Sequence, residues 1–311
     1  MEAQPGSLVL INGEVVTPDR AVVSVHDRGF LYGDSIFEVL RTYDRKPYAL
    51  AEHVERLFQS AGRVAIDMPV SRQALEAEIL SAVAQTSGAG ELVVRVQITR
   101  GIGPLGLDPT LAREPLRVIL VEPIVLPHAD DYRKGIGVVL VQTERTTDNT
   151  PAAGAKVANY LVSLLALREA YAKGAKEAII VDGRGRVLEG TTSNVFVVKD
   201  KVILTPPESE GILPGITRIG LLEAAAAINS PVRITTLTRG DLSSADEVFI
   251  SSTVREVLPV VRIDGEPVAA GEPGPVTRAV HTQFRKGAGL PMRMPWQEPS
   301  LGPLRPGGLG K

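Results

Sequence analysis

The sequence contains no cysteine among its 311 residues. This absence excludes disulfide bonds, thiolate metal sites and cysteine nucleophiles, and it suits a reducing cytoplasm. Histidine is scarce too: the four histidines are scattered, without the spacing of a histidine-based metal site. We therefore expect a cytoplasmic protein without a metal centre.

Long apolar stretches are also absent. No apolar run approaches the roughly 20 residues that cross a bilayer, and the N-terminus lacks the basic and apolar regions of a signal peptide. Acidic and basic residues nearly cancel, so the formal net charge is only -2. Such a charge gives no general attraction to nucleic acid or to an anionic membrane, and we expect neither as a partner.

What the chain does contain is typical of a globular protein, with 44% hydrophobic and 23% charged residues. Many short segments with strand character are parted by turns, and the helical patterns are segregated from them. This favours an α+β fold in two domains. We predict a small N-terminal domain (1–122), an interdomain linker (123–135), a large C-terminal domain (136–286) and a mobile Pro/Gly-rich tail (287–311) with Trp296 as its candidate anchor.

Periodicity predicts several elements around which a site could be built. Strands are expected at residues 22–25, 35–43 and 91–99, the last with Leu92, Val94, Val96 and Ile98 on one face. Helices are expected at residues 52–64, after an N-cap at Ser71, at residues 216–229 and from Pro275.

GIGPLG, residues 101–106, matches the GxGxxG pattern and follows a predicted strand. A dinucleotide site also needs a helix to begin there, so that its N-terminus can hold a pyrophosphate. The next residues, LDPTLAREP, contain two prolines and no helical period. We therefore interpret these glycines as shaping a loop.

Lys156 stands in unusual surroundings, among small and apolar residues in PAAGAKVANYLVSLLALREA (151–170). Such a lysine is either the long stem of a surface residue or a buried amine. Burial disfavours the charged form and lowers the pKa from about 10.4 toward neutrality. A neutral amine can attack a carbonyl carbon and form a Schiff base, which makes Lys156 a candidate nucleophile.

Four further polar features gain interest beside this lysine. GITR, residues 215–218, begins a predicted helix whose N–H groups suit an anion, although an ordinary capped helix looks the same. Arg56 could be a solvated helix residue, the SST stretch at residues 251–253 a polar turn, and Glu189 an exposed carboxylate. Together they match the needs of pyridoxal phosphate, which are a lysine, an anion site for the phosphate and an acid for the pyridine nitrogen.

A series of longer motifs covers nearly the whole chain to about residue 285. As they stand here, these motifs are DRGFLYGDSIFEVLR (27–41), EHVERL (52–57), RVQITRGIGPLGLDP (95–109), KVANYLVSLLALREA (156–170), EAIIVDGRGRVLEGTTSNVF (177–196), LPGITR (213–218), ADEVFISSTVREVLPV (245–260) and GPVTR (274–278). In their sequence and order the chain resembles the class IV, or fold type IV, pyridoxal-phosphate aminotransferases. That family includes branched-chain-amino-acid aminotransferase, D-amino-acid aminotransferase and aminodeoxychorismate lyase.

The resemblance implies a two-domain fold with pyridoxal 5'-phosphate between the domains, in a homodimer whose partner completes the substrate pocket. It implies Lys156 as the catalytic Schiff-base lysine and Glu189 as the partner of the pyridine nitrogen. The other implied cofactor-binding residues are Arg56, Ile216, Thr217 and Thr253 at the phosphate and Tyr160 near the ring oxygen. The implied substrate-binding residues are Tyr32, Phe37, Arg41, Arg95, Leu107 and Val254.

The likeness is greatest to the branched-chain enzymes. Leu105 and Leu107 stand where the well-known bacterial D-amino-acid aminotransferases carry the Arg and His that hold the substrate carboxylate. STVRE (252–256) departs from the GTAAE that branched-chain enzymes often have, so Val254 and Arg255 put carboxylate binding by this turn in doubt. We expect transamination between an aliphatic or branched-chain amino acid and a 2-oxo acid, with 2-oxoglutarate as the expected acceptor. The alternatives are aminodeoxychorismate lyase, a D-amino-acid or (R)-amine transaminase, and a non-catalytic binding protein.

Overall fold

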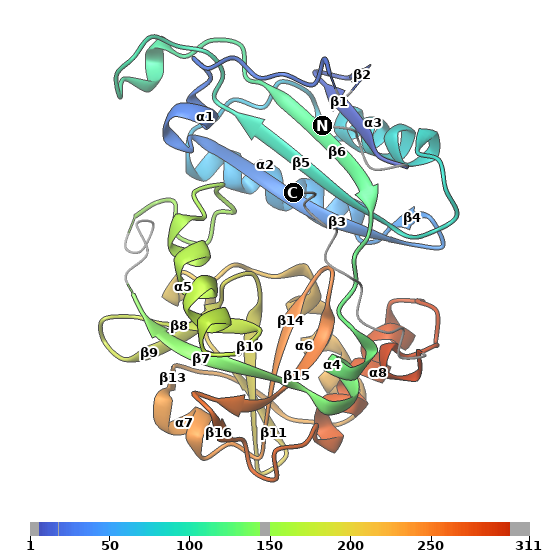
Figure 1. Ribbon diagram of the computed structural model, residues 1–311, viewed down its shortest axis with the longest axis vertical. Coiled ribbons are helices and arrows are strands. Elements are labelled where there is room, and N and C mark those ends of the chain that lie inside the picture. Colours follow the sequence, from blue (N-terminus) through green and yellow to red (C-terminus); the bar gives the residue numbers. More distant parts are fainter. Residues whose placement is uncertain (1–5, 18, 144–149, 299–311) are drawn as a thin grey trace, which may run out of the picture.

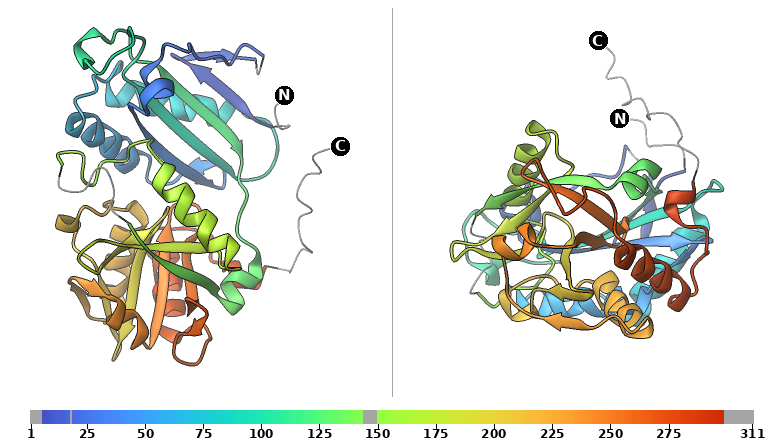
Figure 2. Two further views of the ribbon diagram at one scale, coloured as in Figure 1. Left: turned by 60° about the vertical axis from the view of Figure 1, so that its left-hand side comes forward. Right: turned by 90° about the horizontal axis from the view of Figure 1, so that it is seen from below.

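The computed structural model describes residues 6–17, 19–143 and 150–298. These residues form two halves, each built on its own β-sheet, and the halves lie one above the other in Figure 1. The views in Figure 2 show the same division, with the chain passing from the first half to the second between β6 and α4. Within the described ranges, no helix is long and apolar enough to cross a membrane.

The first half is a six-stranded antiparallel sheet with helices on one face. Its strands, in spatial order, are β2 (Glu14–Val16), β1 (Leu8–Ile11), β6 (Arg117–Pro123), β5 (Leu92–Thr99), β3 (Ser35–Tyr43) and β4 (Lys46–Pro47). Helices α2 (Leu50–Arg63) and α3 (Arg72–Gln85) share one apolar core with the sheet. The predicted alternation of the strand at 91–99 is confirmed, because Leu92, Val94, Val96 and Ile98 are all buried in this core. The short α1 (Arg28–Tyr32) and the 3₁₀ turn η1 (Pro109–Leu111) complete this half.

The second half is a mixed sheet of ten strands. Nine follow the spatial order β12 (Val232–Ile234), β11 (Val202–Thr205), β10 (Asn194–Lys199), β14 (Glu247–Ser252), β15 (Glu256–Ile263), β7 (Ile136–Gln142), β8 (Glu177–Val181), β9 (Arg186–Gly190) and β13 (Leu237–Thr238), and β16 (Glu266–Pro267) pairs with β15. Its helices are α4 (Ala129–Lys134), α5 (Leu161–Ala172), α6 (Ile216–Ala227), α7 (Arg239–Ser243) and α8 (Pro275–Gly287), with 3₁₀ turns η2 (Glu208–Glu210) and η3 (Pro295–Gln297). Strands β7 and β8 are parallel, and the crossover between them contains α5.

The segment that carries Lys156 links the two halves. It precedes α5 in the crossover, yet it pairs with β3 of the first half. The Phe37 N–H donates to the Lys156 carbonyl at 3.0 Å, and the Ala158 N–H donates to the Ser35 carbonyl at 2.9 Å. The Lys156 N–H donates in turn to Ser60 Oγ at 3.1 Å. The backbone of this lysine is therefore fixed by β3 and α2, although the residue belongs to a loop of the second half.

One prediction for local structure was wrong. Residues 22–25, predicted as a strand, form none, and their three valines lie exposed. The predicted linker, residues 123–135, contains α4, which the sequence analysis did not expect. Its signals were present in the sequence: His128 is the N-cap, acidic residues occupy the first turn and basic residues the last. The glycines of residues 101–106 do shape a loop, and no helix begins there.

The predicted tail begins as a packed segment. Its first residues pass over α8, and the ring of Trp296 in η3 lies 5.2 Å from that of His281, edge to face. The guanidinium of Arg278 lies 5.4 Å from the centre of the Trp296 indole. Trp296 thus anchors this segment as predicted, and the rest of the predicted tail, residues 299–311, lies outside the described residues.

Candidate active site

A cavity of about 750 Å³ lies between the two halves and collects polar side chains from both. The first half supplies residues of β3, β5 and α2, and the second supplies the segment before α5, the β9–β10 turn, the start of α6 and the end of β14. Of the site residues predicted from the sequence, ten line this cavity: Phe37, Arg56, Arg95, Lys156, Tyr160, Glu189, Ile216, Thr217, Thr253 and Val254. All the predicted cofactor ligands therefore meet in one place, which the sequence could not show.

Lys156 reaches the cavity from the segment that pairs with β3. Its Nζ lies 4.6 Å from the centre of the Phe37 ring. Burial lowers the pKa of the Lys156 amine to about 8, while the Glu38 and Glu189 carboxylates oppose that shift. Near neutral pH a larger fraction of this amine is therefore unprotonated than in an exposed lysine, and the unprotonated form is the one that a nucleophile or a base requires.

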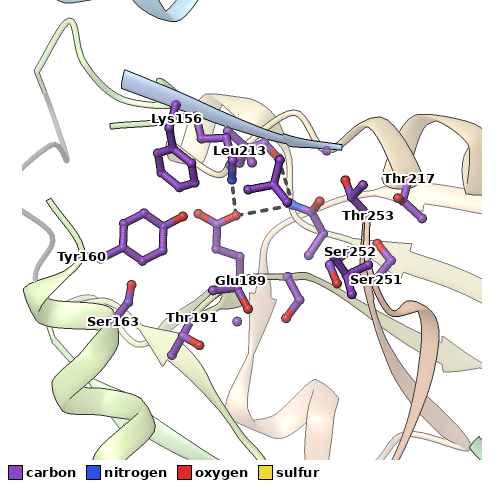
Figure 3. Close-up of a pocket in the computed structure, with 18 of the residues that line it drawn as sticks. Lys156, Tyr160, Ser163, Glu189, Thr191, Leu213, Thr217, Ser251, Ser252 and Thr253 are labelled. Carbon is purple, nitrogen blue, oxygen red and sulfur yellow. Dashed lines mark hydrogen bonds between the residues drawn. The ribbon is translucent and has the colours of Figure 1, made fainter. Parts of the chain in front are cut away.

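Glu189, near the end of β9, points across the cavity toward the hydroxyl of Tyr160 (Figure 3). Its Oε2 accepts hydrogen bonds from the Leu213 N–H at 3.0 Å and from Asn194 Nδ2 at 3.4 Å. Asn194 Nδ2 also donates to the Leu213 carbonyl at 2.9 Å, which fixes the position of the amide. Burial and the neighbouring Glu189 raise the pKa of Tyr160 to about 12, so its phenol stays protonated and can donate a hydrogen bond.

The other end of the cavity is lined with N–H and hydroxyl groups. Helix α6 begins there at Ile216, and the first N–H groups of a helix have no partner within the helix. Figure 3 shows Thr217 and Thr253 side by side at this end, with Ser251 below them. Ser251 Oγ is buried and has no hydrogen-bond partner among the described residues, which is unusual for a hydroxyl. These groups suit an anion such as a phosphate.

Arg56 lines the cavity, but protein groups already hold much of its guanidinium. Its Nε and Nη2 donate to the two oxygens of Glu38 at 2.6 and 2.8 Å, and its Nη1 donates to the Pro214 carbonyl at 2.9 Å. Of the five donors of a guanidinium, three are engaged and two are left for an anion beside α6. Glu38 is 1% exposed and also bonds His53 Nδ1 at 2.8 Å. Burial raises the pKa of Glu38, but Arg56 and His53 outweigh burial and lower it to about 2.

The part of the cavity toward β3 and β5 is mainly apolar. The Arg95 guanidinium stacks on Phe37, with Cζ 3.9 Å from the ring centre, and donates to Gln97 Oε1 at 3.2 and 2.9 Å. Phe37 meets Tyr160 edge to face, with ring centres 5.3 Å apart. Further apolar wall residues are Val39, Val125 and Leu126. This wall suits an aliphatic group, and Arg95 is the cation nearest to it.

Three predicted substrate-binding residues do not line the described cavity. Arg41 is buried behind the turn that follows β14, and its Nη1 donates to the Val254 carbonyl at 3.1 Å. Tyr32 lies on α1, where its hydroxyl accepts a hydrogen bond from the Gly106 N–H at 2.9 Å. Leu107 is 79% exposed in the loop beside it.

The structure also adds groups that the sequence did not single out. Glu38 is a carboxylate within an otherwise apolar stretch of β3, and His53 and Arg56 stand three positions apart on α2. That spacing places both on one helix face and could have indicated a shared acidic partner. No three His, Asp or Glu side chains in the described ranges are placed to hold a metal ion.

Comparisons with known proteins show which family the chain resembles over most of its length. The family model for amino-transferase class IV matches residues 35–263. The chain is 36% identical to a putative branched-chain-amino-acid aminotransferase of Methanocaldococcus jannaschii, over 89% of this chain and 95% of that protein. It is 37% identical to a D-alanine aminotransferase of Staphylococcus aureus, over 89% and 96%.

Solved structures show the same likeness. The branched-chain amino acid aminotransferase of Escherichia coli superposes with a TM-score of 0.85 at 33% identity, covering 90% of this chain and 93% of that one. The T.th. branched-chain amino acid aminotransferase, solved with pyridoxamine 5'-phosphate, superposes with a TM-score of 0.83 at 31% identity, covering 93% and 96%.

Proposed function

The chain belongs to the class IV aminotransferase family, whose members use pyridoxal 5'-phosphate, and we propose that it transfers amino groups between an aliphatic or branched-chain amino acid and a 2-oxo acid such as 2-oxoglutarate. One observation carries the proposal: the Lys156 amine, the Glu189 carboxylate and an anion-binding end share one cavity. The identity of the amino acid rests on the apolar wall and on the named relatives.

The residues present fit pyridoxal phosphate. The N–H groups at the start of α6, the hydroxyls of Thr217 and Thr253 and the two remaining Arg56 donors would hold the phosphate. Ser251 Oγ, which has no partner among the described residues, gives this end a further unused hydroxyl. Glu189 would face the pyridine nitrogen and Tyr160 the ring oxygen. When bound, the cofactor supplies an aldehyde that combines with amines and a ring that withdraws electrons from the α-carbon.

Lys156 has two tasks in the proposed reaction. With a pKa near 8, its unprotonated amine can anchor the cofactor. Released from the cofactor by the substrate amine, Lys156 Nζ would accept the proton from the substrate α-carbon and deliver it to the cofactor carbon that carried the aldehyde, first as general base and then as general acid. The carboxylates of Glu38 and Glu189 stabilise the ammonium form, which makes both directions of proton transfer accessible near neutral pH.

An enzyme selective for D-amino acids is the second candidate, because D-alanine aminotransferases match this chain at about the same identity as the branched-chain relative. Leu105 and Leu107, both largely exposed, occupy the positions of a carboxylate-binding Arg and His in that group, which favours the branched-chain proposal. An aminodeoxychorismate lyase would need the same lysine and carboxylate. Release of pyruvate from aminodeoxychorismate would distinguish it from a transaminase.

We also propose a homodimer. Helix α5, beside the cavity, exposes an apolar stripe that is unusual for a surface helix, formed by Leu161, Leu164, Leu165 and Tyr171. In the dimer that the resemblance implies, Tyr32 and Leu107, which do not line their own cavity, would help to complete the cavity of the neighbour. Sedimentation of the purified protein measures the assembly.

The proposal is tested first with Lys156→Ala. Purified protein supplied with pyridoxal phosphate should show a visible absorption band, and the variant should lose the band while its circular dichroism is retained. Transamination of leucine with 2-oxoglutarate should fall by at least about 10³-fold. Lys173→Ala is the matched control, because Lys173 lies at the exposed end of the helix that follows.

A panel of amino acids then identifies the substrate. L-leucine, L-valine and L-isoleucine should bleach the band faster than D-alanine, and aminodeoxychorismate should yield no pyruvate. A wild-type protein that binds no pyridoxal phosphate would contradict the enzymatic function. Faster bleaching by D-alanine would favour the D-selective candidate.

A further inference from the structure

Asn194, the first residue of β10, lies between the acid of the cavity and its anion-binding end. It is 5% exposed, and the two protons of its amide nitrogen have separate acceptors. Nδ2 donates to the Leu213 carbonyl at 2.9 Å and to Glu189 Oε2 at 3.4 Å, and the Leu213 N–H donates to the same carboxylate oxygen at 3.0 Å. Figure 3 shows these bonds as dashed lines beside Glu189 and Leu213. Each of the three groups therefore limits the movement of the other two.

The oxygen of the same amide packs against Gly215, the N-cap of α6. Gly215 has φ -65° and ψ 132°, which are angles that any residue adopts, and serine, aspartate or asparagine would cap the helix better. A Cβ atom added at Gly215 would lie 2.0 Å from Asn194 Oδ1. The glycine is therefore explained by the close approach of Asn194 and not by the backbone angles.

The segment that Asn194 contacts, residues 213–215, joins the two ends of the cavity. Its first residue donates to the acid and its last residue begins α6. Between them, the Pro214 carbonyl accepts from Arg56 Nη1 at 2.9 Å, so the first half of the molecule holds the segment too. Asn194 is also paired across the sheet with Ser251 of β14, and such opposed residues point to the same face. One buried amide thus contacts every element that could set the separation of the two ends.

We propose that Asn194 is a positioning residue that fixes the Glu189 carboxylate at a set distance from the start of α6, so that a ligand with a ring nitrogen and a phosphate meets both at once. The inference rests on the proposed function and deepens it, because it says how the site selects the whole cofactor over either of its parts. Two groups held at the right separation bind a linked ligand as if its second end were at a high local concentration. Freeing either group lowers that local concentration more than it lowers the affinity for each part alone.

The test compares pyridoxal 5'-phosphate with its two parts, pyridoxal and inorganic phosphate. Titration of the cofactor-free full chain gives the first two dissociation constants from the visible band, and competition with pyridoxal phosphate gives the third. The product of the constants for the parts, divided by the constant for the whole, is the effective concentration of one end for the other. In Asn194→Ala we expect the effective concentration to fall by about tenfold or more, while the constant for inorganic phosphate changes by less than about twofold.

Asn194→Asp separates hydrogen bonding from packing. Aspartate keeps the shape and the oxygen that packs on Gly215, but its second oxygen replaces the donor and faces the Glu189 carboxylate and the Leu213 carbonyl. The effective concentration should therefore fall at least as far as in Asn194→Ala. An effective concentration equal to that of the wild type would mean that Asn194 only fills space, which overturns the positioning role.

Gly215→Ala tests the same contact with Asn194 intact. The added methyl group displaces the Asn194 amide, so the effective concentration should again fall by about tenfold. The double variant Asn194→Ala/Gly215→Ala should lose no more than either single variant, because both changes act through one contact and the overlap is gone. Losses that multiply in the double variant would show that the two residues act separately, against the proposal.

Thr205→Val is the matched control, because Thr205 is fully buried and donates from Oγ1 to the Val195 carbonyl of the same strand at 2.9 Å, and it is not part of the described cavity wall. It should lower the melting temperature and leave the three dissociation constants unchanged. If Asn194→Ala weakens the binding of pyridoxal phosphate only by the product of its effects on the two parts, the ends are not coupled and the inference fails. A wild type that forms no visible band with pyridoxal phosphate contradicts the proposed function instead.

Discussion

Two buried carboxylates, Glu38 on β3 and Glu256 on β15, are held in nearly the same way. Each bonds a histidine at 2.8 Å: Glu38 bonds His53 and Glu256 bonds His281. Each also bonds at least one arginine, and in each the arginine and histidine outweigh burial and lower the pKa of the carboxyl to about 2. Burial lowers the pKa of both histidines below the ordinary value, so at neutral pH the charge balance rests on the arginines.

The two clusters differ in where their arginines lie relative to the cavity. Arg56, bonded to Glu38, lines the cavity beside the start of α6. Arg41 and Arg285, bonded to Glu256, do not line the cavity and instead join β3 of the first half to α8 of the second. The same chemical arrangement therefore supports the cavity wall beside α6 in one case and the contact between the two halves in the other.

The largest effect is expected from the matched substitutions Glu38→Gln and Glu256→Gln. Each leaves a buried arginine without its counter-charge, and each should lower the free energy of unfolding by about 3 kcal/mol. Only Glu38→Gln should also raise the dissociation constant of pyridoxal phosphate, by about tenfold or more, because Arg56 loses its counter-charge and one of its two hydrogen bonds to this side chain. Denaturant unfolding of the cofactor-free protein and titration with cofactor give the two quantities.

The comparison breaks if both variants lose cofactor affinity equally, since Arg56 would then have no separate role. It also breaks if Glu38→Gln lowers the free energy of unfolding but leaves cofactor affinity unchanged. Arg72→Ala serves as the control, because the Arg72–Glu55 pair joins the exposed surfaces of α3 and α2. Its loss should change the free energy of unfolding by less than about 1 kcal/mol.

Much of the fold follows from local patterns. The alternation of residues 91–99 and the N-cap Ser71 were sufficient to predict β5 and α3, because burial of one face and a capped helix end leave their mark within a few residues. Residues 22–25 were predicted wrongly because a strand also requires a partner strand, and no local pattern shows whether one is present. Helix α4 was not predicted, because it is short, two prolines precede it, and its helix signals are confined to its cap and charged ends.

The residues of the site also fall into two groups, those with a local sequence signal and those without one. Lys156 and the start of α6 could be predicted because an apolar lysine and a glycine before a helix are local features. The positions of Arg41 and Arg255 could not, because their directions are set by Glu256 and Glu177, whose side chains lie 215 and 78 positions away in the chain. A cation that faces a pocket and one that faces a buried carboxylate have the same sequence signature.

A smaller effect concerns the pH dependence of cofactor uptake. Only unprotonated Lys156 attacks the aldehyde, so the rate at which cofactor-free protein regains its visible band should rise with pH and level off above about 8. The Glu38 carboxylate favours the ammonium form, so Glu38→Gln should lower the pKa of Lys156 and move the plateau to lower pH. Glu256→Gln should leave the midpoint in place, and an equal shift in both variants would remove the distinction between the clusters.

The smallest effect is expected at Trp296, which covers the Glu256 cluster from outside. Its ring lies edge to face on His281 and under the Arg278 guanidinium, so Trp296→Leu should cost about 1 kcal/mol of unfolding free energy, through lost aromatic and cation–π contacts. Trp296→Phe keeps a ring against His281 and should lose less. Cofactor affinity and the pH midpoint should not change in either variant, because η3 packs on α4 and α8, beside the Glu256 cluster. A loss in Trp296→Leu as large as that in Glu256→Gln would mean that the C-terminal segment, and not the buried carboxylate, holds this side of the molecule together.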